Sequence, residues 1–181
     1  MKKMIIGAII GGLLLFIWQT LSWTALNLHS DQYQKTAAQD SILQFLGTQL
    51  KSDGHFMVPT VDPNAGAEEI EKITADMKGK PWAVINYHSA YNVDMGSNIL
   101  RGLLVDIIIA WLVCWILLGN PQPGFGRTYL SCLAIGLTGY LFLPYSEYMW
   151  YQTGGATQNL IDVLVSWSLC GVWLGWWLGR K

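Results

Sequence analysis

The sequence predicts an α-helical integral membrane protein, with a four-helix transmembrane bundle and a small α/β extracytoplasmic domain between spans one and two. Two observations predict this fold class. Hydrophobic residues make up 52% of the 181 residues and charged residues only 13%, about half the charged share of an average soluble domain. The apolar residues also gather into four runs with the length and composition of membrane-spanning helices.

The first apolar run extends from Met4 to Leu26 and contains no charged residue. Its length suffices to cross a hydrocarbon core of roughly 30 Å as a helix. A removable secretory signal would need small residues at its cleavage site, but Trp18, Gln19 and Trp23 stand there. We therefore expect an uncleaved signal anchor.

Three further spans follow in the second half of the chain. The second span is expected at Ile99–Leu118, and the fourth at about Leu160–Leu178. The third begins at Thr128, after the turn-rich stretch Pro121–Gly126, and Pro144 ends or kinks it.

The distribution of charge predicts how the chain is threaded. Short loops rich in Lys and Arg stay in the cytoplasm. The two ends of the chain and the turn between spans two and three carry five basic residues and no acidic one. The five are Lys2, Lys3, Arg127, Arg180 and Lys181. All twelve acidic residues lie elsewhere. We therefore expect a multi-pass protein of the bacterial inner (cytoplasmic) membrane with both termini cytoplasmic. Residues 1–26 would form span one, residues 27–98 the extracytoplasmic domain, and residues 99–181 spans two to four.

The extracytoplasmic segment is long enough for a small folded domain. Apolar spacing predicts a helix at Thr36–Leu50 and, after a turn at Asp62–Asn64, a second helix that ends by Gly79. Short strands are expected at His55–Thr60 and Pro81–His88. Such a domain buries only a thin core. We therefore expect it to rest on the outer ends of the spans.

Polar residues gather near the outer membrane boundary, whereas the inner halves of the spans are almost entirely apolar. Charges at membrane depth are costly and often functional. The cluster could bind a proton, a cation, a lipid headgroup or a quinone head. The preferred interpretation is a network that joins helix ends to the outer domain, with Arg101 paired to Asp106 or Asp162. Its predicted members are Gln19, Ser22, His29, Arg101, Asp106, Glu147 and Asp162.

No motif of the sequence predicts catalysis, a metal site or a cofactor. The three histidines are far apart in the sequence, and the three cysteines lie inside spans without a C-x-x-C pair. There is no nucleophile elbow and no phosphate-binding loop. A net charge of −1 also argues against a nucleic-acid partner.

Small and aromatic residues predict how the spans pack and where they meet the interface. Four-residue glycine spacing permits close helix approach, and we expect spans one and four to touch there. The glycines are Gly7, Gly11, Gly171, Gly175 and Gly179. Aromatic belts mark both membrane surfaces. The expected belt residues are Trp18, Trp23, Trp115, Trp150, Tyr151, Trp176 and Trp177.

Three short motifs carry a resemblance. They are Phe16-x-Trp18 followed by Ser22, Gly54-x-aromatic-x-x-Pro59, and Tyr148-x-Trp150-Tyr151. With these the chain resembles a family of small uncharacterised bacterial membrane proteins with four spans and one extracytoplasmic domain. Family members often have a histidine after the serine of span one, where this chain has Trp23. The resemblance implies the topology and no activity.

Two functions remain open from the sequence. The first is a non-catalytic integral subunit or accessory protein of a larger inner-membrane assembly, with the lipid bilayer and other membrane subunits as partners. The second is a protein that binds or transports a small molecule, ion, lipid or quinone through the outer polar cluster. A membrane enzyme is the weakest alternative, because no nucleophile–base pair is visible.

Overall fold

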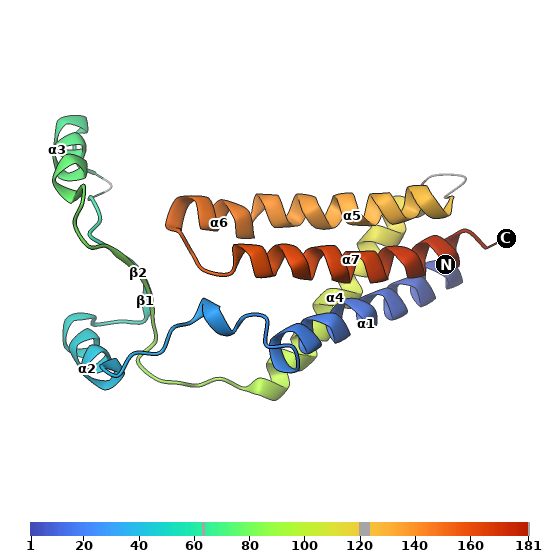
Figure 1. The fold of residues 1–181 in the computed structure, drawn as a ribbon, viewed down its shortest axis with the longest axis horizontal. Helices are drawn as coiled ribbons and strands as arrows, with labels where there is room; N and C mark the ends of the chain where they lie inside the picture. The colour runs from blue at the N-terminus through green and yellow to red at the C-terminus, as the bar shows by residue number, and fades with distance from the viewer. Residues whose placement is uncertain (63, 120–123, 181) are drawn as a thin grey trace. The chain divides into compact units, whose positions relative to one another are not determined.

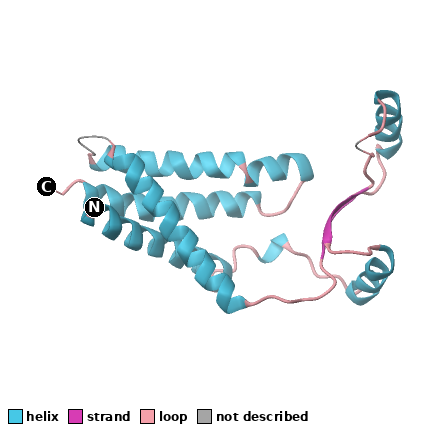
Figure 2. Ribbon diagram, turned by 180° about the vertical axis from the view of Figure 1, so that it is seen from behind, coloured by secondary structure: helices cyan, strands magenta, loops and turns pink. Residues whose placement is uncertain are grey.

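The computed structural model describes residues 1–62, 64–119 and 124–180. The protein is mostly helical and divides into two compact units (Figures 1 and 2). The helical unit comprises residues 1–34 and 94–181, and the small unit comprises residues 35–93. Residues 27–34 were predicted to be part of the extracytoplasmic domain, but they belong to the helical unit. Parts of the turns expected at Asp62–Asn64 and Pro121–Gly126 lie outside the described residues, as does Lys181.

Four helices of the helical unit are long and apolar enough to span a membrane, as predicted. They are α1 (Lys2–Thr24), α4 (Met95–Leu118), α5 with α6 (Phe125–Phe142 and Pro144–Tyr151) and α7 (Ala156–Leu178). Pro144 begins α6 directly after α5, so it interrupts the third span without ending it.

The second span begins earlier than expected because Asp94 caps it. The Asp94 carboxylate accepts hydrogen bonds from the Ser97 backbone N–H at 3.3 Å and from the Ser97 hydroxyl at 2.6 Å. These bonds satisfy a free N–H of the first helical turn. They also lower the pKa of Asp94 below its ordinary value. Helix α4 therefore starts at Met95 rather than Ile99.

The helices contact one another in the order α4, α1, α7, α5, and α4 and α5 touch only marginally. Among the glycines, the closest approach to the backbone of another helix is at Gly12 of α1, against α4. A Cβ atom there would lie 2.6 Å from the backbone Cα of Ile107. Glycine is thus required for these two helices to meet at this distance.

The glycines of the first and last spans face different neighbours. Gly7 and Gly11 of α1 face side chains of α4 and α7, which include Cys114 and Cys170. Spans one and four therefore lie in contact there. However, Gly171 and Gly175 of α7 face α5, through Tyr129, Cys132 and Phe125. The two glycine patches do not meet each other, because α7 packs between α1 and α5 and turns its glycines toward α5.

The small unit has the predicted order of helix, strand, helix and strand. Its elements are α2 (Gln39–Gln49), β1 (Gly54–Val58), α3 (Ala67–Met77) and β2 (Ala83–Tyr87). The two strands pair antiparallel, with Gly54 opposite Tyr87 and Val58 opposite Ala83. None of the described residues from 35 to 93 is buried. This unit therefore has no closed hydrophobic core of its own.

Candidate functional site

The segment after α1 folds back onto the helix that it leaves. Asn27 has a positive φ of 50°, a left-handed conformation that Asn tolerates better than most residues. The backbone N–H of Leu28 then donates to the Ser22 carbonyl at 3.0 Å. A short 3-10 helix, η1 (Ser30–Gln32), follows. This reversal brings His29 beside the last turns of α1.

Asp162 of α7 is the centre of the polar contacts. Its Oδ1 accepts hydrogen bonds from the Trp18 indole N–H at 3.0 Å and from the Ser22 hydroxyl at 2.6 Å. Its Oδ2 lies 2.8 Å from Nε2 of His29. We call Trp18, Ser22, His29 and Asp162 the Asp162 cluster. The cluster joins α1 and the segment after it to α7.

The cluster contains two titratable residues, His29 and Asp162, and His29 is the less exposed of the two. Its side chain is 2% exposed, and its ring stacks on Trp23 with centroids 4.0 Å apart and planes 2° apart. Nδ1 lies 3.1 Å from Oε1 of Gln32. A carboxylate can only accept, so Nε2 donates to Asp162. Both ring nitrogens therefore have a partner within the protein. The histidine thus positions its neighbours, and neither nitrogen is free to act as a base.

Two glycines make room for the residue that holds His29 from its other side. Gly155, the N-cap of α7, has a φ of 88°, and a Cβ there would lie 2.9 Å from Cδ of Gln32. Gly154 lies against the Gln32 backbone. The pair Gly154–Gly155 thus lets Gln32 pack at the start of α7 and reach His29.

Asp106 lies on the other side of α1 from this cluster, on α4. It is 3% exposed, and its Oδ1 is 3.5 Å from the Gln19 side-chain N–H donor. Its Oδ2 has no hydrogen-bond partner among the described residues. An unpaired carboxylate in an apolar interior is strongly disfavoured. This enclosure makes Asp106 a candidate for binding a proton or a cation.

The structure brings together only part of the predicted polar cluster. Ser22, His29 and Asp162 share hydrogen bonds, and Gln19 pairs with Asp106. Arg101 and Glu147 are exposed, and neither forms an ion pair within the described residues. The expected pairing of Arg101 with Asp106 or Asp162 is therefore not present.

Two residues of the site were expected to serve only as interface aromatics. Trp18 donates to Asp162, and Trp23 stacks on His29. The spacing of Trp18 and Ser22, one helical turn apart, is the signal that could have placed both on the α7 side of α1. Of the other belt residues, Trp177 donates to the Lys3 carbonyl, and four are exposed: Trp115, Trp150, Tyr151 and Trp176.

The small unit also has a polar contact at Asp53 that was not predicted from the sequence. Asp53 accepts a hydrogen bond from the Ser89 backbone N–H at 2.9 Å, and its carboxylate lies 3.6 Å from His88. The hydrogen bonds from Ser89 lower the pKa of Asp53. The contact is exposed to solvent and connects the entrance of β1 to the exit of β2.

Comparison with known proteins adds no relative. No family model, no curated protein and no solved structure matches the chain. Across the described residues, no group of three His, Cys, Asp or Glu side chains converges in a way that could hold a metal ion.

Proposed function

We propose that the chain is a non-catalytic integral subunit or accessory protein of a larger bacterial inner-membrane assembly, and that its small unit is the part that docks on a partner. The observation that carries this proposal is the lack of any buried residue among the described residues from 35 to 93. A unit of this size without a closed core is marginal by itself. Contact with another surface would supply the missing burial.

Helix α2 supplies the best docking surface of the small unit. Ile42, Leu43 and Phe45 are 46%, 60% and 63% exposed. They lie within one turn of a helix of only 11 residues, in which no residue is buried. Contiguous apolar side chains in contact with water commonly mark an interaction site.

The Asp162 cluster supports the same function. Its hydrogen-bonding groups are satisfied within the protein, which is typical of a network that holds helices together. It fixes the chain as far as Gln32, just before the small unit begins. The cluster would thus provide a firm attachment point for a docking domain.

Phe45→Ser is expected to release the partner while leaving the helical unit folded. The substitution removes the most exposed apolar side chain of α2, so the complex should shift from a large to a small species in native gels of membrane extracts. Thr48→Ser, on the same helix, is the matched control and should leave the large species intact. A small species already present with the wild-type chain, or no shift with Phe45→Ser, would contradict docking through α2.

A second candidate function is favoured by the unpartnered Oδ2 of Asp106. A buried carboxyl without a protein cation beside it suits a protein that binds a proton or a small cation at membrane depth. Asp106→Asn keeps the shape but cannot exchange a proton. Under this second function it would abolish cation-dependent stabilisation of the purified chain. Equal stabilisation by Na⁺ in wild type and Asp106→Asn would remove this candidate and leave the accessory role.

A further inference from the structure

We propose that the helical unit binds an anionic phospholipid, with one acyl chain in the apolar groove between α1 and α7 and the phosphate at Arg180. The inference goes beyond the accessory function and does not depend on it. It requires only that the four apolar helices lie in a membrane.

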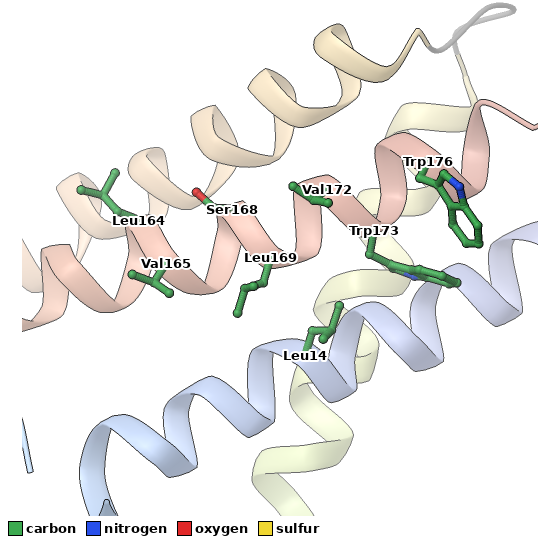
Figure 3. A pocket seen from close by; sticks show the side chains of 8 residues that line it. All are labelled: Leu14, Leu164, Val165, Ser168, Leu169, Val172, Trp173 and Trp176. Carbon is green, nitrogen blue, oxygen red and sulfur yellow. The ribbon is translucent and has the colours of Figure 1, made fainter. Parts of the chain in front are cut away.

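The groove offers almost purely apolar contacts. Its volume is about 660 Å³, within the range of small-molecule sites. Leu14 of α1 and a row of α7 side chains line it, as Figure 3 shows. Its one polar side chain, Ser168, lies 3.3 Å from the Tyr129 hydroxyl, so its hydroxyl already has a partner. A hydrocarbon chain fits these surroundings.

The groove also has a suitable length. It extends along α7 from Leu164 to Trp176. At about 1.5 Å per residue this stretch measures about 18 Å. One leaflet contributes about half of a hydrocarbon core of roughly 30 Å. The groove can therefore hold one acyl chain over the depth of one leaflet.

The groove leads to a basic end of the helical unit. Trp176 lines both the groove and a smaller hollow of about 300 Å³ that includes Arg180. The Arg180 guanidinium carbon lies 3.5 Å from the centroid of the Trp176 ring. This cation–π contact holds the guanidinium at the mouth of the groove.

A second cation lies at the same end. The Lys3 ammonium donates to the Arg180 carbonyl oxygen, and the start of α1 lies beside the end of α7 (Figure 1). Residues 1–30, 107–146 and 163–181 contain no Asp or Glu. A phosphate at this end would thus meet Arg180 and Lys3 without a competing Asp or Glu side chain from these segments. Basic pockets beside membrane helices bind anionic headgroups in this way.

The charge at the groove's mouth favours a lipid over the helix of a partner protein. An apolar partner helix would fill the groove but leave the guanidinium and ammonium groups without counter-charge. A phospholipid supplies an apolar chain and an anion in the same molecule. Phosphatidylglycerol matches both features, whereas phosphatidylcholine carries a compensating positive charge.

The test uses the full chain, purified in mild detergent and freed of lipid. Tryptophan fluorescence would follow thermal unfolding during titration with phosphatidylglycerol, with phosphatidylcholine of the same acyl chains, and with inorganic phosphate. We expect phosphatidylglycerol to stabilise the chain at the lowest concentration. Arg180→Gln and Lys3→Gln should each weaken its apparent affinity by about fivefold. Arg101→Gln, which removes a positive charge elsewhere on the helical unit, is the control and should change nothing.

The groove is tested separately from the charges. Leu169→Trp fills it while leaving Arg180 and Lys3 in place, and should weaken phosphatidylglycerol binding even if a charge variant does not fold. Equal stabilisation by phosphatidylcholine would overturn the headgroup assignment. Stabilisation by phosphate alone, or unchanged binding in Leu169→Trp, would overturn the acyl-chain assignment. If a cross-linker at position 169 captured a polypeptide in membranes, the occupant of the groove would be a partner helix. That result would overturn the lipid assignment.

Discussion

Asp162→Ala is expected to lower the free energy of unfolding by about 3 kcal/mol, the cost of leaving enclosed hydrogen-bond donors without their acceptor. The substitution leaves the Trp18 indole, the Ser22 hydroxyl and the His29 ring without their common acceptor. Since His29 and Ser22 are almost fully enclosed, water cannot replace the carboxylate at either group. Denaturant unfolding of the chain in mild detergent measures the effect.

Two further variants make this expectation specific. His29→Ala should cost nearly as much, because it removes the donor to Oδ2 of Asp162 and the enclosed ring that stacks on Trp23. Thr20→Ala is the matched control on the same helix: Thr20 is exposed, and its hydroxyl donates only to the Phe16 carbonyl of that helix. It should change the free energy of unfolding by less than about 0.5 kcal/mol. Similar losses in all three variants would mean that the cluster is not a connected network.

Gly12→Ala is expected to destabilise the helical unit by about 2–3 kcal/mol, through overpacking between α1 and α4. The added Cβ would meet backbone atoms of Ile107, the Cα at 2.6 Å and the N at 2.7 Å. Backbone cannot rotate away as a side-chain end can, so the helices must separate and lose contacts along their length. The same unfolding measurement tests this.

Gly139→Ala on α5 is the matched control. Apart from the adjoining backbone of its own helix, no atom of the described residues lies within 4 Å of its Cβ position, so the added methyl group meets open space. Replacing a mid-helix glycine by alanine then stabilises by about 0.5–1 kcal/mol. Opposite signs for the two substitutions are expected. A loss of stability in Gly139→Ala equal to that in Gly12→Ala would show that glycine is needed for a reason other than close packing.

The sequence predicts the helices well because their signals are local. Apolar runs, Pro144 and the spacing of the small unit's apolar residues depend on neighbours in the chain. The start of α4 differs from the prediction because its cap, Asp94 with Ser97, lies before the apolar run that was used to find it. A capping signal read together with the run would have placed the start at Met95.

The candidate site was only partly predictable, because it depends on rotation and pairing of helices. The depth expected in a membrane grouped Ser22, His29 and Asp162, which share hydrogen bonds in the structure, but depth says nothing about which helix face each residue occupies. For that reason Arg101 was expected to pair with an acid, whereas it forms no ion pair within the described residues. Gly12 was not predicted for the same reason: the prediction used the four-residue spacing of Gly7 and Gly11, while the closest approach to another helix's backbone lies one residue later.

The central claim is that the four apolar helices cross a membrane with both termini in the cytoplasm and the small unit outside. Labelling by a membrane-impermeant thiol reagent in intact cells tests it most directly. The native cysteines Cys114, Cys132 and Cys170 are buried and give a low background. We expect Asp62→Cys to be labelled from outside and Gly124→Cys to be labelled only after the membrane is permeabilised. Labelling of Gly124→Cys but not Asp62→Cys in intact cells would contradict this threading.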